Sequence, residues 1–301
     1  MEVLVYGAGA LGSLVGGLLA RTHDVTLVGR DAHMRRIRDE GLRIDGEVDG
    51  HVRPRAVTDG TQRSAELALV TTKAYDTDTA GSDIATGTYD VVCSLQNGLT
   101  EERLVAAVDP PVLAGTASYG ARFVEPGHVR CTGVGEIAVG ALAGGPSALA
   151  NRVARAFGAA GIETTAAEDM PRRRYEKLAV NAGINGPSAL ARVTNGEVWM
   201  GPAGDVAREA AREVAAVARG DGVDLPDPAA VEAVERVARD TAVNRSSMCT
   251  DIEAERRTEV DAIYGTILER AEKHDLDVPT CRTLSALIRA WEGGEGVRDD
   301  G

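Results

Sequence analysis

Lysine is nearly absent from this 301-residue chain, which holds three lysines and thirty arginines. Arginine is permanently charged in proteins, whereas a lysine can release and regain a proton when its surroundings shift its pKa. A chain that otherwise avoids lysine can therefore retain one where a transferable proton is needed. The three lysines are Lys73, Lys177 and Lys273, and the first two stand in polar motifs.

Cysteines and aromatic residues are also few. The four cysteines lie far apart and form no C-x-x-C pair, which argues against both a zinc site and a disulfide framework. We expect buried, reduced thiols and no metal. With two Phe, two Trp and six Tyr, the core must consist largely of Ala, Val, Leu and Gly, and such small residues imply close helix packing.

The chain lacks clustered basic residues and long apolar runs. Its formal charge of −13 argues against nucleic acid and anionic membranes as partners, and no apolar run reaches the length of a membrane span. The first residues are typical of a core strand rather than a signal peptide, so we expect a soluble, cytoplasmic protein. Carboxylates spread along the whole sequence indicate an acidic, halophilic-type surface suited to a saline cytosol.

The length of the chain favours two domains. Short apolar runs at residues 3–6, 24–28, 67–70, 91–95 and 112–115 alternate with helical patterns, as a mostly parallel doubly wound sheet requires. A hairpin near residues 125–137 and a helix at 147–160 follow, and from residue 168 the pattern is almost wholly helical. We predict an α/β fold, with an N-terminal Rossmann-type doubly wound sheet in residues 1–167 and a C-terminal all-helical domain in residues 168–301.

A glycine motif stands between the first predicted strand and a helix expected from residue 13. Gly7 permits the tight turn, Gly9 lets the backbone approach a pyrophosphate, and Gly12 lets the helix pack closely on the strand. The alternative is a loop that uses these glycines for packing alone. Because strand, glycine loop and helix occur in this order, we interpret the motif as a dinucleotide site with contacts from Gly7, Gly9, Ala10, Leu11 and Gly12.

The second predicted strand ends at Gly29 and Arg30, where the adenosine ribose of a bound dinucleotide would be recognised. An acidic residue here would bind the two ribose hydroxyls, whereas the guanidinium of Arg30 suits a 2′-phosphate, so NADPH is favoured over NADH. Asp31 leaves an alternative open, since it can either cap the helix predicted around residues 34–38 or reach the ribose itself.

Two later strand ends carry polar residues, in Thr71-Thr72-Lys73 and in Gln96-Asn97-Gly98. Lys73 is either a solvated loop charge or, in a cofactor crevice, a partner for NADP phosphates or an anionic substrate. Asn97 with Gly98 is either a simple turn or a polar part of that crevice. His128, in a Pro-Gly turn, is expected at the surface, and no histidine has a spacing typical of a proton relay, so no catalytic histidine is predicted.

Three polar residues in the second half, Lys177, Asn181 and Asn185, follow one another at intervals of four. They share one face of a predicted helix, which we expect to end at Gly186-Pro187. A buried hydrogen-bond ladder between helices would account for the asparagines alone. The added lysine favours a substrate site in a crevice between the domains.

Two further motifs follow in the helical half. Ser246 and Ser247 precede a new helix and serve either as N-caps or, with the free N–H groups of that helix, as ligands for a carboxylate. Glu259 opens a helix predicted to run to about residue 273. It either sits in a favourable first turn or reaches Lys177 and orients the ammonium.

Together these motifs resemble the ketopantoate reductase family over nearly the whole chain. The resemblance rests on GAGALG at Gly7, Arg30, TTKAY at Lys73, QNG at Asn97, EPGHV at His128, KLAVNAGIN at Lys177, NRSSM at Ser247 and TEVDAIYG at Glu259. It implies a Rossmann domain and a helical domain, NADPH as cofactor, and reduction of 2-dehydropantoate to (R)-pantoate in pantothenate and coenzyme A biosynthesis.

The resemblance also implies roles for single residues. Lys177 would polarise the C2 ketone oxygen and deliver its proton as the general acid. Glu259 would contact the distal hydroxyl of the substrate and Lys177, and Ser247 would hold the substrate carboxylate.

Four other positions complete the resemblance. Asn97, Asn181 and Asn185 would line the pocket for substrate and nicotinamide, and Lys73 would lie near both ligands. Tyr175 departs from the family pattern, because its position is often occupied by Trp.

Two other functions fit parts of the sequence. A reductase of another 2-oxoacid would share the fold and act on a substrate with a different tail. Glu259 discriminates between the two, because a carboxylate at this position is expected mainly if the tail carries a hydroxyl. A nonenzymatic NADP-sensing protein would keep the glycine loop without a proton donor, and Lys177 with its asparagines argues against it. We expect a small-molecule 2-oxoacid as partner and a monomer or homodimer.

Overall fold

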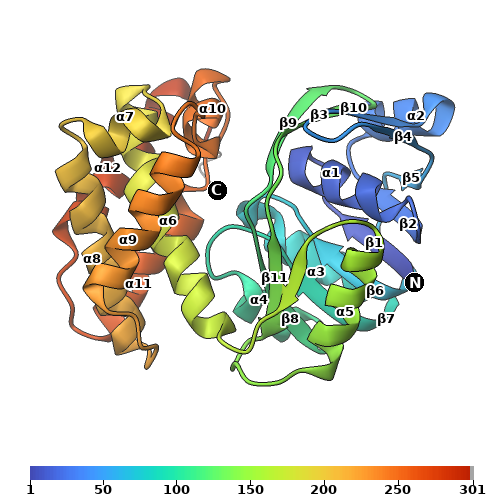
Figure 1. Ribbon diagram of the computed structural model, residues 1–301, viewed down its shortest axis with the longest axis horizontal. Helices are drawn as coiled ribbons and strands as arrows, with labels where there is room; N and C mark the ends of the chain where they lie inside the picture. The colour runs from blue at the N-terminus through green and yellow to red at the C-terminus, as the bar shows by residue number, and fades with distance from the viewer. Residues whose placement is uncertain (299–301) are drawn as a thin grey trace. The chain divides into compact units, whose positions relative to one another are not determined.

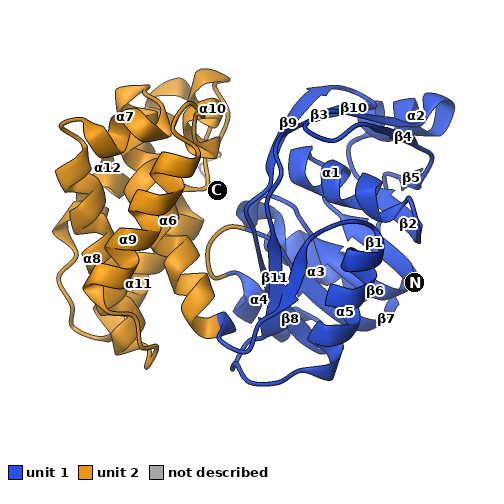
Figure 2. Cartoon of the chain, in the orientation of Figure 1, with its two compact units in different colours: residues 1–96, 100–170 blue, residues 97–99, 171–301 orange. Residues whose placement is uncertain are grey.

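A computed structural model describes residues 1–298, and the chain divides into two compact units (Figure 2). Unit 1 consists of Met1–Gln96 and Thr100–Met170, and unit 2 consists of Asn97–Leu99 and the chain from Pro171 onward. The predicted architecture, a Rossmann-type sheet followed by an all-helical part, is confirmed.

The short segment Asn97–Leu99 groups with unit 2, although the prediction placed it in the first domain. Leu99 is buried in the hydrophobic core of unit 2. Gly98 has a φ of +85° and approaches the Ala262 backbone so closely that a Cβ on it would lie 2.4 Å from the Ala262 carbonyl oxygen. These contacts join residues far apart in the sequence, so local sequence patterns do not predict them.

The main sheet of unit 1 has eight strands in the order β12-β11-β8-β7-β6-β1-β2-β5 (Figure 1). Neighbouring strands are parallel, apart from the antiparallel pair of β8 and β11. The strands are β1 (Glu2–Tyr6), β2 (Asp24–Val28), β5 (Arg55–Val57), β6 (Ser64–Val70), β7 (Thr88–Ser94), β8 (Val112–Ala117), β11 (Ile137–Ala141) and β12 (Thr164–Ala166). All five strands predicted for this sheet are present.

Helices cover both faces of this sheet. The helices of unit 1 are α1 (Ala10–Leu19), α2 (Asp31–Glu40), the 3₁₀ helix η1 (Ala74–Asp76), α3 (Thr77–Ile84), α4 (Glu101–Ala107) and α5 (Ala148–Ala159). Val3 and Val5 share a core with α1 and α5, whereas Leu4, on the other face of β1, packs with α3 and α4. The alternation of side chains along a strand thus produces the doubly wound arrangement.

A second sheet in unit 1 was not predicted in full. It has the order β4-β3-β10-β9, with strands β3 (Leu42–Gly46), β4 (Gly50–Val52), β9 (Gly120–Glu125) and β10 (His128–Gly133). The hairpin of β9 and β10 overlaps the one predicted near residues 125–137, but it begins at Gly120 and ends at Gly133. Helix α1 packs between the two sheets, because Gly16 lies against Leu27 of the main sheet and Gly17 against Ile44 of the second. Small residues allow this double contact.

His128 is buried rather than exposed, which corrects the prediction. It begins β10, beside β3, and its Nε2 lies 3.0 Å from Oδ2 of Asp45. The Pro-Gly turn indicates a surface loop in the sequence, but β10 pairs with β3, and the His128 side chain lies beside Asp45 of that strand.

The described residues of unit 2 form helices and the loops that connect them, without a strand. Its helices are α6 (Met170–Ala191), α7 (Asn195–Met200), α8 (Gly204–Gly220), α9 (Asp227–Asp240), α10 (Ser247–Glu253), the π-helix η2 (Asp261–Gly265), α11 (Thr266–Lys273) and α12 (Pro279–Glu295). Its core is rich in buried alanines from α6, α8 and α9, so the helices approach closely as the composition suggested.

Two helix boundaries differ from the prediction. Helix α6 continues through Pro187 to Ala191 instead of ending at Gly186-Pro187. The segment after Glu259 is not one α-helix, because it begins as the π-helix η2 and becomes α11 at Thr266. At the first boundary, a tertiary contact accompanies the continued helix, because the Tyr264 hydroxyl bonds to the Ala182 and Gly186 backbone.

The four cysteines are free and buried, as predicted. Among residues 1–298, no three His, Cys, Asp or Glu side chains are grouped to hold a metal ion. None of the helices described in that range combines the length and the apolar character that a bilayer crossing requires.

Candidate active site

The carboxyl ends of the central strands bring the predicted cofactor residues of unit 1 to one edge of the sheet. Tyr6 is paired with Val28 on one side and Val70 on the other, and Val70 is paired with Ser94. The segments that follow these residues therefore leave the sheet side by side. The chain passes from β1 to β2 on one side and later to β6 on the other, which makes this edge a topological switch point.

The glycine loop has the shape that a dinucleotide needs. Gly7 has a φ of +109°, and a Cβ on Gly12 would lie 2.3 Å from the Gly7 carbonyl oxygen, so both positions require glycine for the fold itself. A Cβ on Gly9 would meet only that same oxygen, at 4.0 Å. The space beside Gly9 is therefore open to an approaching pyrophosphate.

Gly9 is also the N-cap of α1, so the helix begins at Ala10 rather than at residue 13. The first N–H groups of a helix have no partner within it and favour anions. Ala10, Leu11 and Gly12 supply these groups in α1. The residues present fit the phosphates of a dinucleotide.

Two residues of the predicted polar motifs, to which the sequence alone assigned no role, support this edge. The Thr71 hydroxyl donates to the Gly7 carbonyl at 3.0 Å. The Gln96 amide donates to the Thr72 and Thr77 hydroxyls, each at 3.0 Å, and accepts from the Thr100 hydroxyl at 3.0 Å. A polar residue directly after a buried strand was the signal available in the sequence.

Arg30 and Asp31 have separate environments. Arg30 is the N-cap of α2, and its exposed guanidinium makes no hydrogen bond or ion pair within residues 1–298. Asp31 lies in the first turn of α2 and forms an ion pair with Arg35, four residues later. Asp31 is thus engaged along its own helix, while Arg30 is available to a phosphate.

Lys73 directly precedes η1 and is partly buried. It follows Thr72, whose hydroxyl accepts from Gln96. The carboxyl edge of the unit 1 sheet therefore carries the glycine loop, Arg30 and Lys73.

Unit 2 contains a hydrogen-bonded chain of three predicted site residues. Asn181 donates through Nδ2 to Oδ1 of Asn97 at 3.3 Å, and Asn97 donates through its own Nδ2 to Oε2 of Glu259 at 2.9 Å. Asn181 and Glu259 are buried. The chain links the short Asn97–Leu99 segment, α6 and Glu259, which lies two residues before η2.

Lys177 lies one helical turn before Asn181 on α6. Burial lowers the pKa of its ammonium below the usual value, and the Glu259 carboxylate opposes this change. A lysine with a lowered pKa gives up its proton more readily than an exposed one. The negative charge of Glu259 favours the protonated form that a proton donor must start from.

Asn185 is connected through Ser188 to Ser246, the residue before Ser247. The Ser188 hydroxyl donates to the Asn185 carbonyl at 3.1 Å and lies 2.7 Å from the Ser246 hydroxyl. Ser246 is the N-cap of α10, because its hydroxyl accepts from the Cys249 N–H at 3.0 Å. The capping alternative therefore applies to Ser246, while Ser247 is exposed in the first turn of α10.

His33 is a buried structural histidine. The Gly127 N–H donates to its Nδ1 at 2.9 Å, so its Nε2 carries the proton and donates to the Ser13 hydroxyl at 2.9 Å. Burial lowers its pKa to about 4. The ring fixes α1 and α2 to the hairpin turn in the neutral form and has no free nitrogen for catalysis.

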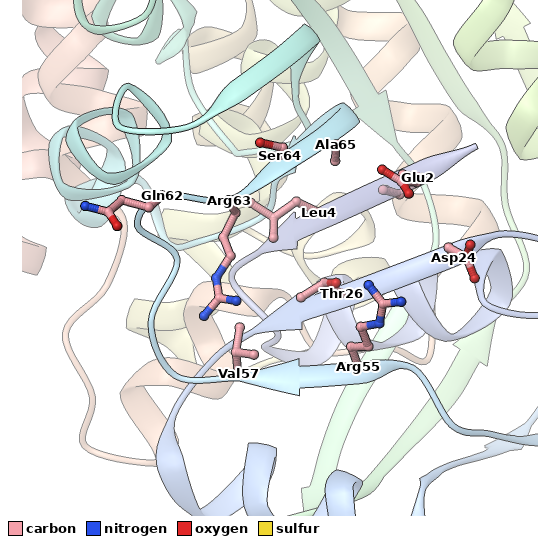
Figure 3. A pocket seen from close by; sticks show the side chains of 11 residues that line it. Glu2, Leu4, Asp24, Thr26, Arg55, Val57, Gln62, Arg63, Ser64 and Ala65 are labelled. Atoms are coloured by element: carbon pink, nitrogen blue, oxygen red, sulfur yellow. The ribbon is translucent and has the colours of Figure 1, made fainter.

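A separate pocket of unit 1 lies at the opposite edge of the main sheet (Figure 3). Its lining includes Glu2, Asp24 and Ser64, the first residues of β1, β2 and β6. Nucleotides bind open parallel sheets at the carboxyl ends of the strands. This pocket is therefore not part of the candidate cofactor site.

Known proteins match both parts of the chain. Residues 3–144 match the family described as "Ketopantoate reductase PanE/ApbA", and residues 169–292 match "Ketopantoate reductase PanE/ApbA C terminal". The chain belongs to the ketopantoate reductase family. The predicted family membership is thus confirmed.

Individual relatives cover nearly the whole chain. The 2-dehydropantoate 2-reductase of Halobacterium salinarum is 41% identical over 96% of this chain and 98% of its own length. That of Archaeoglobus fulgidus is 38% identical, over 97% of this chain and 98% of its own length.

Solved structures show the same fold. A PanE/ApbA family ketopantoate reductase from Ralstonia eutropha aligns with a TM-score of 0.90 at 32% identity, covering 98% of this chain and all of its own. A D-mandelate dehydrogenase with NADH and anilino(oxo)acetate aligns with a TM-score of 0.92 at 25% identity, covering 99% of this chain and 100% of its own.

Proposed function

We propose that this protein reduces 2-dehydropantoate to (R)-pantoate with NADPH, as a ketopantoate reductase. The observation that carries the proposal is the assembly of Lys177, Asn97, Asn181 and Glu259 in unit 2. The names of the full-length relatives support the choice of substrate.

The proposed cofactor contacts come from the carboxyl edge of the unit 1 sheet. Gly7, Gly9, Ala10, Leu11 and Gly12 would hold the pyrophosphate against the start of α1. Arg30 would bind the 2′-phosphate and Lys73 would add positive charge nearby. NADPH, when bound, supplies the hydride that becomes the new hydrogen on C2.

Lys177 would supply the second hydrogen. As the hydride adds to C2, the carbonyl oxygen gains a negative charge, and a nearby ammonium both stabilises that charge and donates a proton to the oxygen. The products are the alcohol, the oxidised cofactor and a neutral lysine, which regains its proton from water. Glu259 would orient the ammonium and restore its preference for the charged form.

The remaining polar residues would orient the substrate. Asn97, Asn181 and Asn185 offer amide groups to the substrate and the nicotinamide, and the exposed Ser247 hydroxyl at the start of α10 suits the carboxylate. Glu259 would also accept a hydrogen bond from the distal hydroxyl of the substrate.

The test is the rate of NADPH oxidation with 2-dehydropantoate by the wild type, Lys177→Ala and Lys273→Ala. Lys273 is an exposed lysine in the last turn of α11 and serves as the matched control. We expect Lys177→Ala to lower kcat at least about hundredfold without changing NADPH affinity. Wild-type kcat in Lys177→Ala would refute its role, and absence of wild-type turnover would refute the substrate.

A second candidate is reduction of another 2-oxoacid. This candidate is supported by the similarity to a D-mandelate dehydrogenase, whose structure contains NADH and anilino(oxo)acetate. A panel of 2-oxoacids with and without a 4-hydroxyl distinguishes the two. Higher kcat/KM for acids that lack the hydroxyl would favour this second function.

The proposed reaction needs no partner besides the 2-oxoacid and the cofactor. We also propose that the enzyme is cytoplasmic and acts as a monomer or a homodimer. Sedimentation velocity distinguishes these two oligomeric states directly.

A further inference from the structure

Tyr264 inserts its hydroxyl into the backbone of another helix. The residue belongs to the π-helix η2 and is fully buried. Its hydroxyl accepts a hydrogen bond from the Gly186 N–H at 3.1 Å and donates one to the Ala182 carbonyl at 2.7 Å. In a regular α-helix these two backbone groups, four residues apart, bond to each other. The turn of α6 from Ala182 to Gly186 is thus bridged by a side chain from η2.

The neighbouring residues of α6 are suited to this insertion. Pro187 has no N–H, so the Gly183 carbonyl loses its usual partner in the next link of the ladder. Gly186 makes room for the ring, since a Cβ there would lie 2.2 Å from the Tyr264 hydroxyl oxygen. Inserted side chains and prolines are recognised causes of helix distortion. Two consecutive links of α6 therefore depart from the regular pattern.

The altered turn lies within the candidate active site. Asn181 precedes it and Asn185 lies inside it, so the turn sets how Asn185 is placed relative to Asn181 and Lys177. At the other end of the contact, Glu259 stands just before η2, and its carbonyl accepts from the Ile263 N–H at 3.1 Å. Tyr264 thereby joins the segment that carries Glu259 to the helix that carries the lysine and the asparagines.

The phenol is held in the form that both bonds need. Burial raises the pKa of Tyr264 well above its usual value, so the hydroxyl keeps its proton and can donate to Ala182. A phenylalanine would fill the same space and leave the Ala182 and Gly186 backbone groups either unpaired or bonded to each other. Either outcome changes the geometry of the turn.

We propose that Tyr264 is a positioning residue for the reductase, which sets the placement of Asn185 and Glu259 around Lys177 through its two bonds to α6. The inference rests on the proposed function and deepens it. A residue that acts through geometry changes substrate binding and turnover, whereas a purely structural residue changes the stability of unit 2 alone.

The first experiment compares Tyr264→Phe with Tyr175→Phe. Tyr175 is also buried in unit 2, and its hydroxyl donates to Asp221, which keeps Arg270 and His274 as partners. We expect Tyr264→Phe to raise the KM for the 2-oxoacid about tenfold and to leave the KM for NADPH within about twofold. Tyr175→Phe should leave both values within about twofold of the wild type. A wild-type 2-oxoacid KM in folded Tyr264→Phe would overturn the proposal.

Pro187→Ala provides a second test with the opposite effect on stability. Alanine restores the N–H that the Gly183 carbonyl lacks and favours the helix, so the urea midpoint should rise. If the altered turn positions the site, the 2-oxoacid KM should nevertheless rise at least about threefold. A more stable variant with an unchanged KM would contradict the proposal, even if Tyr264→Phe fails to fold.

Failure of the positioning role is separable from failure of the proposed function. Wild-type turnover and the loss of kcat in Lys177→Ala test the reductase assignment. The ratio of variant to wild-type KM tests Tyr264 and is measured with whichever 2-oxoacid the wild type reduces.

Discussion

The two units build their candidate sites in different ways. In unit 1 the site is built mainly on backbone, with a glycine loop, a helix start and the ends of adjacent strands, to which Arg30 and Lys73 add positive charge. In unit 2 it consists of side chains on helices, connected by the hydrogen bonds of Asn97, Asn181 and Glu259. The first kind of site is determined by local sequence, whereas the second depends on contacts between residues far apart in the chain.

The sharpest test of the backbone site is Gly9→Ala. The structure has room for this Cβ, so the unfolding temperature should stay within about 2 °C of the wild type. The same methyl group would occupy the path of the pyrophosphate, and the Kd for NADPH should rise about hundredfold.

Fluorescence titration with NADPH measures this change. Gly158→Ala is the matched control, because a Cβ at that position of α5 meets nothing within 4 Å. Equal NADPH affinities for the two variants would mean that the open space at Gly9 is not the cofactor site.

A second test measures how the stability of unit 1 depends on pH through His33. Its pKa is about 4 in the folded protein and 6.5 in the unfolded chain, so the unfolded chain takes up the proton first as the pH falls. The stabilising effect of neutral His33 is complete above pH 6.5 and declines toward pH 4. After allowance for solvent screening, we expect a loss of about 2 kcal/mol in the free energy of unfolding over that range.

Urea unfolding at several pH values measures this loss. His33→Gln should remove that part of the pH dependence, while the exposed His51→Gln should retain it. The same slope in both variants would show that another group is responsible.

A smaller effect is expected at the edge of the cofactor site. Arg30→Asp replaces the exposed guanidinium at the start of α2 with a carboxylate that repels a phosphate. The KM for NADPH should rise about tenfold and the KM for NADH should change little. Equal changes in the two values would show that Arg30 does not recognise the 2′-phosphate.

The same contrast explains which features could be predicted from the sequence. The strands and the glycine loop follow from short patterns of apolar residues and glycines, and the structure contains them. The spacing of Lys177, Asn181 and Asn185 correctly places all three on one helix. The roles of these residues, and the halophilic character of the surface, stay predictions.

The missed features depend on distant partners. Pro187 predicts a helix end, but α6 continues to Ala191. Just before Pro187, the Gly186 N–H bonds to the hydroxyl of the distant Tyr264. The second sheet requires β10 to pair with β3, more than eighty positions earlier in the chain. The place of Asn97 in unit 2 depends on Leu99 and Gly98. Local propensity cannot report such contacts.

In the proposed reaction, unit 2 supplies a proton from Lys177 under the control of Glu259. The most direct measurement is the pH dependence of kcat for the wild type and Glu259→Gln. Because the donor must be protonated, kcat should fall as the pH rises through the lowered pKa of Lys177. Glu259 raises that pKa, so its replacement should move the fall in kcat to a lower pH. A fall at the same pH in both proteins would contradict the account.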